Sequence, residues 1–361
     1  MSISDVIPQV RVLIADDSTV MRTALVRMLE SSPIIRVCGT ARNGVEAVQK
    51  TKILQPDVVT MDVDMPVLDG IQALKQIMRE SPCPVVMVSS LTLEGAKVTL
   101  DALEAGAFDY LPKEDLCHEA GALQLRYDLV EKIEAAARSP LALRKKPFHA
   151  LTLGFVDNGL LNRSHVVPKL VVLGTSTGGP KALQEILPEL PGDLPVGILV
   201  VQHMPPGFTA AFAKRLNGLC KLSVREARHG EMVEAGTVYV APAGQHTTIF
   251  NNGLHQPTLS LSDLPSETVH KPSVDVTMLS AADLFGEYTL GIILTGMGCD
   301  GLEGMTAIRD AGGITIGQNE ATCAVYGMPR ACADRGILQK VLPLSQIPQQ
   351  ILLALRYRAC Q

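Results

Sequence analysis

The fold of the C-terminal half is decided by residues 169–183, which read KLVVLGTSTGGPKAL. Leu170 to Leu173 form a continuous apolar run, as expected of a strand that is buried on both faces of a sheet. The glycines and proline at 178–180 then mark the entry to a helix. We therefore expect Ser176 at the tip of a tight turn, beside the free N–H groups of that helix, which is the arrangement that a serine nucleophile needs.

Glycine-rich turns between a strand and a helix are common, so Ser176 needs partners from elsewhere in the chain. Two further apolar strands are expected, over Val196 to Val201 and over Thr289 to Leu294. The first leads into His203, and the second leads into a loop that carries Asp300. Because the carboxyl ends of parallel strands share an edge, the three side chains should meet there as nucleophile, base and orienting carboxylate.

Each member of this set also has a plain alternative role. His203 taken singly is more often a structural loop histidine, and Asp300 precedes an expected helix over 302–310, where capping is its default role. The chain order Ser, His, Asp differs from the Ser, Asp, His order of α/β-hydrolases, although residues 174–178 fit their G-x-S-x-G elbow. We interpret the set as a convergent acyl-transfer site.

The N-terminal third alternates short apolar strands with helices, which predicts a parallel sheet covered on both faces. The strand ends should bring five polar side chains to one edge: Asp16, Asp17, Asp62, Ser89 and Lys113. Three carboxylates this close repel one another, so an oxygen-rich site of this kind suits a magnesium ion. The alternative is that each aspartate caps a helix. Strands are expected over 10–14, 36–38, 57–61, 85–88 and 107–111, with helices that include 44–54.

The motifs ADDS, MDVDMPVLDG, MVSS and DYLPK closely resemble the receiver domain of two-component response regulators, over residues 8–130. The resemblance implies a flavodoxin-like, doubly wound sheet. It also implies that Asp62 accepts a phosphoryl group from a histidine kinase. Asp16 and Asp17 would hold Mg²⁺ together with Asp62, and the carbonyl of Asp64 would complete the protein ligands.

The same resemblance assigns roles to the other end of the receiver. Ser89 and Lys113 would contact the phosphoryl oxygens, and Tyr110 would change orientation on activation. One departure is visible, because Glu114 and Asp115 follow the lysine where many receivers have a proline. This departure removes no chemical group.

Residues 131–167 are expected to hold the end of a helix over 123–137 and then a linker, because the apolar period fails and Pro, Gly and charge take over. Residues 168–361 then alternate again, which predicts a second doubly wound, mostly parallel, Rossmann-like α/β domain. A linker of this length could let the receiver cover the Ser176 edge and leave it on phosphorylation. We assign no partner to the basic triplet at 144–146.

Behind the receiver, GTSTGG, VVQHMPPGFT, YVAPAGQH, HKPSVDV and ILTGMGCDG follow in order, and the chain thereby resembles the protein-glutamate methylesterases of chemotaxis. The resemblance implies that residues 168–361 are the catalytic domain. Ser176, His203 and Asp300 would be catalytic, and the backbone N–H of Met297 would stabilise the oxyanion. Four more residues stand in these motifs, of which two are interpreted as supporting the site and two as structural or substrate-facing: Thr177 and Gln202, then His246 and Ser273.

The activity that this resemblance implies is hydrolysis of glutamate γ-methyl esters on chemoreceptors, with release of methanol. Deamidation of glutamines at the same site is also implied. The esterase chemistry would need no cofactor, and the phosphodonor would be the chemotaxis histidine kinase. A mouth rich in methionine and proline at 204–206 suits a helical protein substrate.

Composition excludes several other classes. The chain has 361 residues, of which 47% are hydrophobic and 19% charged, so it should form two globular domains. A net charge of -5 and aromatic residues at 4% argue against nucleic-acid binding. Eight cysteines without zinc spacing indicate reduced thiols. Because neither a signal peptide nor a membrane-length apolar run is present, we expect a cytoplasmic protein without membrane insertion.

Two other outputs fit a receiver less well. A DNA-binding helix-turn-helix domain is far smaller than the C-terminal half and needs a basic face. A dinucleotide-binding domain needs a glycine where Ser176 stands between Gly174 and Gly179. It also needs an acidic residue at the end of the next strand, where Gln202 and His203 stand.

Overall fold

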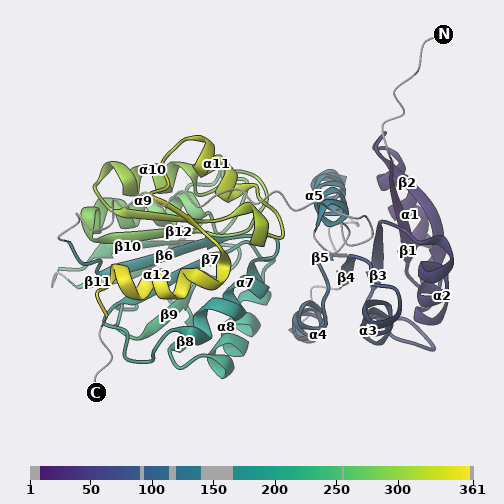
Figure 1. The fold of residues 1–361 in the computed structure, drawn as a ribbon, viewed down its shortest axis with the longest axis horizontal. Helices are drawn as coiled ribbons and strands as arrows, with labels where there is room; N and C mark the ends of the chain where they lie inside the picture. The colour runs from purple at the N-terminus through teal and green to yellow at the C-terminus, as the bar shows by residue number, and fades with distance from the viewer. Residues whose placement is uncertain (1–8, 90–92, 114–118, 140–165, 254–255, 358–361) are drawn as a thin grey trace, which may run out of the picture. The chain divides into compact units, whose positions relative to one another are not determined.

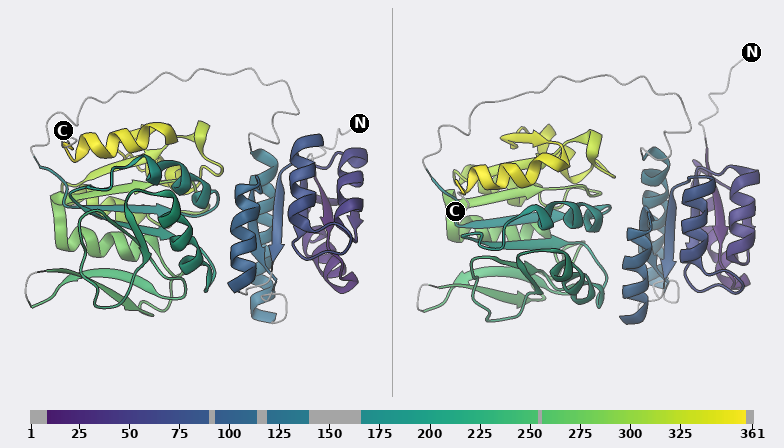
Figure 2. Two further views of the ribbon diagram at one scale, coloured as in Figure 1. Left: turned by 90° about the horizontal axis from the view of Figure 1, so that it is seen from below. Right: turned by 60° about the horizontal axis from the view of Figure 1, so that its bottom comes forward.

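The structure is a computed structural model that describes residues 9–89, 93–113, 119–139, 166–253 and 256–357. The chain divides into two compact units, Met1–Leu151 and Thr152–Gln361. Figures 1 and 2 show the first in purple to blue and the second in teal to yellow. Glu114 and Asp115 lie outside the described residues, as do two of the eight cysteines, Cys117 and Cys360. Most of the expected linker also lies outside them.

The N-terminal unit is built on a five-stranded sheet in the order β2-β1-β3-β4-β5, in which every neighbouring pair is parallel. This order is that of the flavodoxin-like fold and confirms the predicted class. The strands are β1 (Val10–Ala15), β2 (Ile35–Ala41), β3 (Val58–Asp62), β4 (Val85–Ser89) and β5 (Asp109–Pro112). The helices are α1 (Thr19–Glu30), α2 (Gly44–Leu54), α3 (Gly70–Glu80), α4 (Leu93–Glu104) and α5 (Glu119–Arg138).

Helices cover both faces of this sheet because its strands are apolar on both sides. Leu25 and Leu29 of α1 pack with Leu129 and Ile133 of α5 over one face, against Val12 and other strand residues. On the other side α2 packs against α3, and α3 packs against α4. The sheet is thereby buried, and only its strand ends remain open for polar side chains.

The C-terminal unit is built on a seven-stranded sheet in the order β14-β13-β12-β6-β7-β9-β8, and all its pairs are parallel. This confirms the predicted parallel α/β class. The strands are β6 (Leu170–Thr175), β7 (Gly197–Gln202), β8 (Ser223–Glu226), β9 (Thr237–Val240), β12 (Thr289–Ile293), β13 (Ile314–Gln318) and β14 (Lys340–Leu342). An antiparallel hairpin of β10 (His246–Asn251) and β11 (Pro257–Ser262) was not predicted.

Two helix layers enclose the C-terminal sheet. Figure 1 shows α9 (Val274–Phe285), α10 (Leu302–Asp310) and α11 (Met328–Asp334) together above the strands. The remaining helices of this unit are α7 (Gly179–Ile186), α8 (Phe208–Leu219) and α12 (Ile347–Ala354), and α8 packs against α7, β8 and β9. Short 3-10 helices among the described residues of this unit link elements: η3 (Leu187–Glu189), η4 (Gly286–Tyr288), η5 (Glu320–Thr322) and η6 (Leu344–Gln346). Among the described helices, none is both long and apolar enough to span a bilayer.

The strand order places a topological switch at β6. From β6 the chain moves to β7 on one side, and it later returns to β12 on the other side before it continues to β13 and β14. Helices therefore leave the carboxyl ends of β6 and β12 toward opposite faces, and a crevice forms between these ends in folds of this type. Ser176 is the first residue after β6.

Glycine is required where α7 begins. Gly178 caps the helix with a φ of 78°, which L side chains rarely adopt. A Cβ on Gly179 would lie 2.0 Å from Gln202 Oε1 and 2.3 Å from Thr175 Oγ1. The two glycines thus allow the chain to turn sharply after Ser176 and to begin a helix directly against β6 and β7.

We expect Gly304→Ala to destabilise the C-terminal unit, because its Cβ would lie 2.4 Å from Cβ of Met278 on α9. Overpacking of this kind costs about 1–3 kcal/mol of unfolding free energy, measured by calorimetric or urea unfolding. Gly218→Ala is the matched control, since Gly218 lies on α8 with no atom within 4 Å of the added Cβ. It should be neutral or stabilising by up to about 1 kcal/mol. Equal effects of the two substitutions would contradict close α9–α10 packing.

Candidate active site

The loop after β6 is tied to the ends of the strands on either side of it. Ser176 N–H donates to Thr295 O (3.1 Å), and His203 N–H donates to Thr175 O (3.2 Å). The side-chain amide of Gln202 donates to both Ser176 O and His203 O, each at 2.9 Å. These bonds fix the backbones of Ser176 and His203 relative to each other through the side chain of Gln202.

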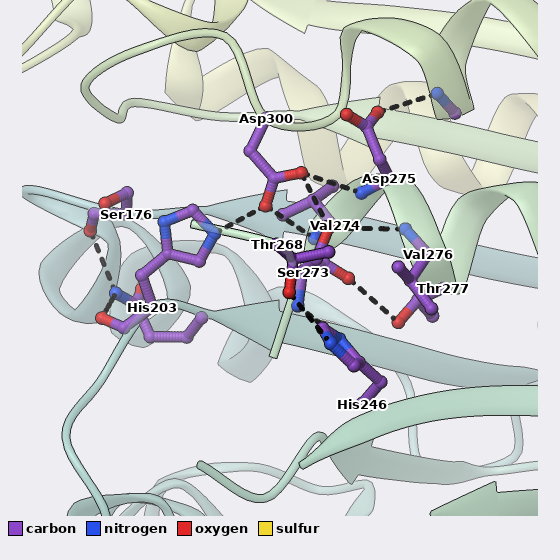
Figure 3. A network of polar contacts seen from close by, with 12 residues as sticks. Ser176, His203, His246, Thr268, Ser273, Val274, Asp275, Val276, Thr277 and Asp300 are labelled. Carbon is purple, nitrogen blue, oxygen red and sulfur yellow. Dashed lines mark hydrogen bonds and ion pairs between the residues drawn. The ribbon is translucent and has the colours of Figure 1, made fainter. Parts of the chain in front are cut away.

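His203 is bound at one ring nitrogen only. Its Nε2 lies 2.7 Å from Asp300 Oδ2, whereas Nδ1 is buried and has no hydrogen-bond partner among the residues that the structure describes. Figure 3 shows Ser176 and Asp300 on opposite sides of the His203 ring. Nδ1 is therefore the nitrogen available to Ser176. The Ser176 hydroxyl makes no hydrogen bond to it among the described contacts, and such bonds often tighten only when substrate binds.

Asp300 is held by the first turn of α9. Its carboxylate accepts hydrogen bonds from Val274 N (2.7 Å), Asp275 N (3.0 Å) and Ser273 Oγ (2.9 Å), in addition to the contact with His203. Burial alone would raise the pKa of Asp300, but His203 and these N–H groups outweigh it and hold the pKa well below its usual value. Asp300 therefore stays ionised and can orient an imidazole.

The alternative role considered for Asp300, capping of the helix that follows it, is wrong. Gly301 is the N-cap of α10, and the Asp300 carboxylate instead binds the N-terminus of α9. The reverse contact also exists, because Asp275 near the start of α9 accepts a hydrogen bond from Gly304 N in α10 (2.8 Å). Each helix start is thus bound by a carboxylate that belongs to the other helix start.

The exchange brings two carboxylates close together. Burial raises the pKa of Asp275 to about 6, although the bond from Gly304 opposes the rise and the charge of Asp300 adds to it. Asp300, with the imidazole as its partner, keeps the negative charge. Sequence reasoning missed Asp275, and the only available signal was its place in the HKPSVDV motif.

His246 and Ser273 lie behind the site. His246 is fully buried, its Nδ1 accepts from Ser273 N (3.2 Å), and its Nε2 lies 3.1 Å from Pro265 O and 3.0 Å from Thr268 Oγ1. Burial lowers the pKa of His246. Of the two roles left open for His246, these contacts support the structural one, as a neutral anchor for residues 265–273 (Figure 3). Ser273 does more, since its hydroxyl also binds Asp300.

A second imidazole, which the sequence did not single out, lies against the first. The rings of His270 and His203 are stacked, with centroids 4.0 Å apart and planes inclined by 23°. His270 also stands in the HKPSVDV motif, so its position there was the only signal in the sequence.

The loop after β12 lies directly against Ser176. A Cβ on Gly296 would be 2.9 Å from Ser176 Cβ, so only glycine allows this approach. Met297 follows, and its N–H makes none of the hydrogen bonds found among the described residues, as an oxyanion donor requires. Thr177 is buried, and its carbonyl accepts from Thr295 Oγ1 (2.9 Å), which holds the same two loops together.

A separate acidic site lies at the strand ends of the N-terminal unit. Asp16 and Asp62 are buried, Asp17 is exposed, and the ligand atoms of all three lie within 4.8 Å of one another. Lys113 Nζ lies 2.6 Å from Asp62 Oδ2 and 3.1 Å from Asp16 Oδ2. Asp16 Oδ2 nevertheless lacks a hydrogen bond of proper geometry. A buried carboxylate oxygen in this state, beside two further carboxylates, fits a hard cation such as Mg²⁺.

Burial also decides the electrostatics of this site. It raises the pKa of Asp62 to about 6, against the opposing effect of Lys113 and with a further rise from Asp16. Asp64 N–H donates to Asp62 Oδ1 (3.3 Å), which keeps the Asp64 backbone beside the site. An added cation would replace this repulsion by attraction and favour the ionised carboxylates.

The remaining predicted receiver residues are placed as follows. Tyr110 on β5 is buried, with Lys132 Nζ 5.6 Å from its ring centroid, and burial raises its pKa well above the usual value. Ser89 is the last residue of β4 and is paired with Pro112, next to Lys113. The side chain of Ser89 lies outside the described residues.

Comparisons with known proteins show which families the chain resembles. Residues 171–351 match the family described as CheB methylesterase, and residues 12–118 match the response regulator receiver domain. A protein-glutamate methylesterase/protein-glutamine glutaminase of Desulfitobacterium hafniense is 44% identical, over 95% of this chain and 96% of its own. One of Pyrococcus abyssi is 41% identical, over 96% and 94%. The crystal structure of the Thermotoga maritima CheB methylesterase catalytic domain matches with a TM-score of 0.50 and 40% identity, over 52% of this chain and 99% of that one.

We expect Asp275→Asn to stabilise the C-terminal unit at neutral pH. The amide oxygen can still accept from Gly304, while the charge that burial and Asp300 oppose is removed. Because the folded pKa of about 6 lies above the unfolded one, the wild type loses stability as pH rises toward 6. The melting temperature of the variant should therefore exceed that of the wild type above pH 6, and the difference should vanish toward pH 4. A difference that grows toward low pH would contradict this assignment.

Proposed function

Because the chain belongs to the CheB methylesterase family and carries a receiver domain, we propose that it hydrolyses glutamate γ-methyl esters on chemoreceptors under phosphorylation control. The same site deamidates glutamines, as the names of its relatives indicate for those proteins. Membership of this family supports the further parts of the proposal, which are chemoreceptors as the substrate, a histidine kinase as the phosphodonor and a cytoplasmic location.

One observation carries the proposal. At the ends of three adjacent strands, Asp300 binds Nε2 of His203, and the unpartnered Nδ1 remains on the side where Ser176 lies. A buried imidazole nitrogen without a hydrogen-bond partner lowers the stability of the folded state, so its presence calls for a functional explanation. A serine hydroxyl that passes its proton to this nitrogen would supply such an explanation.

The mechanism follows from these positions. Ser176 Oγ attacks the ester carbonyl carbon while its proton passes to Nδ1 of His203, and Asp300 stabilises the imidazolium through Nε2. The Met297 N–H binds the oxyanion, and such a donor typically contributes about 3 kcal/mol. The proton on Nδ1 then goes to the departing methoxide, which leaves as methanol. Water attacks the acyl-enzyme with His203 as base, and glutamate and free Ser176 result. With a glutamine side chain, ammonia leaves instead.

The receiver acts through its own carboxylates. A carboxylate oxygen of Asp62 attacks the phosphorus of the kinase's phosphohistidine, the P–N bond breaks and the imidazole leaves, so that Asp62 becomes an aspartyl phosphate. Mg²⁺, when held by Asp16, Asp17, Asp62 and the Asp64 carbonyl, supplies positive charge for the phosphoryl oxygens. Two further side chains, Ser89 and Lys113, bind these oxygens, and Tyr110 responds by changing orientation. The esterase site itself is built from protein groups and needs no cofactor in this scheme.

We assign residues 8–130 to the receiver, 131–167 to the end of a helix and a linker, and 168–361 to the catalytic domain. In this assignment the unphosphorylated receiver inhibits the esterase, and phosphorylation of Asp62 relieves the inhibition. Inhibition of this kind needs only that the two receiver states interact differently with the catalytic domain.

Methanol release from methyl-esterified chemoreceptor membranes tests the esterase. We expect the full chain to release methanol, and Ser176→Ala to reduce the rate by at least about 10³-fold, because the nucleophile is lost. Far-ultraviolet circular dichroism should confirm that the variant is folded. Release by Ser176→Ala at the wild-type rate would exclude this serine as the nucleophile.

Control by the receiver is tested with Mg²⁺ and a small phosphodonor in the same assay. We expect the rate to rise for the wild type and to remain at the basal level for Asp62→Asn, which cannot form the acyl phosphate. Residues 168–361 alone should be more active than the unphosphorylated full chain. A truncated chain that is no more active would argue against inhibition by the receiver.

A further inference from the structure

The contact between His270 and His203 is not explained by the catalytic set described above. The two imidazoles lie face to face, with centroids 4.0 Å apart. His203 is otherwise almost enclosed, since its side chain is 8% exposed. His270 comes from a different segment, between β11 and α9, and its ring covers one face of the His203 ring.

A single hydrogen bond does not fix the plane of an imidazole. Asp300 holds Nε2, but Nδ1 has no hydrogen-bond partner in the described part of the chain, and the torsion about the Cβ–Cγ bond of histidine is soft. Rotation about this bond changes the direction of the Nδ1 lone pair relative to Ser176. A flat ring against one face of His203 opposes such rotation, because tilting would bring the two rings into collision.

From this contact we propose that His270 is a positioning residue. Its ring keeps the His203 imidazole in the plane in which Nδ1 faces Ser176. This inference rests on the proposed function, since it concerns the same site. His270 itself takes no proton and touches no reacting atom in this scheme.

The segment that carries His270 is fixed on both sides of it. Before His270, Thr268 Oγ1 lies 3.0 Å from Nε2 of buried His246, and after it Ser273 N–H donates to Nδ1 of the same ring. The carbonyl of Lys271 accepts from Gly244 N (3.0 Å). One buried imidazole thus clamps both ends of the segment, so the His270 ring is presented from a rigid support.

The chemistry of the cycle makes this contact useful in a second way. When Ser176 attacks, His203 gains a proton and becomes an imidazolium in a site with little water. The face of an aromatic ring attracts a cation, and more strongly when both are desolvated. The stacked ring of His270 can therefore stabilise the charged state of His203 without a hydrogen bond.

The test compares variants of the full chain that keep or remove the ring. His270→Phe keeps a flat ring but lacks the ring nitrogens. His270→Gln keeps a polar amide but lacks the ring. His270→Ala lacks both the ring and a polar group. Val269→Ala is the matched control, because Val269 is the preceding residue and is 82% exposed. The readouts are the rate of Ser176 modification by a fluorophosphonate, kcat and KM for methyl-ester hydrolysis, and thermal melting.

We expect Gln and Ala at position 270 to lower the labelling rate and kcat by about 10- to 100-fold, as a misplaced catalytic group does. The KM of these two variants should stay within about twofold of the wild-type value, and His270→Phe should retain most of the wild-type labelling rate and kcat. Val269→Ala should match the wild type. This pattern, with similar melting temperatures, would support positioning by the ring.

Other results overturn the inference. If folded Gln and Ala variants label Ser176 at the wild-type rate, His270 does not position His203, although the esterase assignment stands. If His270→Phe labels Ser176 as slowly as His270→Gln does, the ring nitrogens of His270 are needed and its flat ring is not sufficient. If the wild type itself is not labelled at Ser176, the proposed function is wrong, and the inference that rests on it is wrong as well.

Discussion

The Asp300 carboxylate is the group on which the catalytic arrangement depends. It receives two N–H groups from the first turn of α9, the Ser273 hydroxyl and Nε2 of His203. A buried charge is tolerated only when it is paired and hydrogen-bonded, and here all of these donors point at one carboxylate. The same bonds join the loop after β12, the start of α9 and the loop after β7. Loss of this carboxylate would leave the imidazole, the helix start and a buried serine without their shared partner.

The two units follow one rule with different chemistry. In each, a parallel sheet buried on both faces leaves only its carboxyl strand ends for polar groups. The N-terminal unit places Asp16 and Asp62 there with Lys113, and burial raises the pKa of Asp62 to about 6. The C-terminal unit places Ser176, His203 and Asp300 there, and an imidazole lowers the pKa of the carboxylate. The first arrangement favours a cation, and the second favours a proton relay.

Most of the fold could be read from apolar runs and turn residues, because strand and helix periods are local properties of the chain. The β10–β11 hairpin was missed, because the sequence analysis predicted no strand over His246–Asn251 or Pro257–Ser262. The strand ends indicated that Asp300 would meet His203 and that Asp16, Asp17 and Lys113 would meet Asp62, and these side chains do lie together. They did not indicate that Asp300 caps α9 rather than the adjacent α10, since capping across two helices depends on how the helices pack.

The sequence by itself determined two parallel α/β units, the residues at their strand ends and the family, because these follow from local pattern and from motifs of fixed spacing. Only the tertiary structure decided which nitrogen of His203 is bound and that His270 stacks on His203. It also decided that Asp275 binds the N-terminus of α10 while Asp300 binds that of α9. These contacts join segments that are 25 to 97 residues apart in the chain. Their geometry is set by strand order and helix packing, which no local pattern encodes.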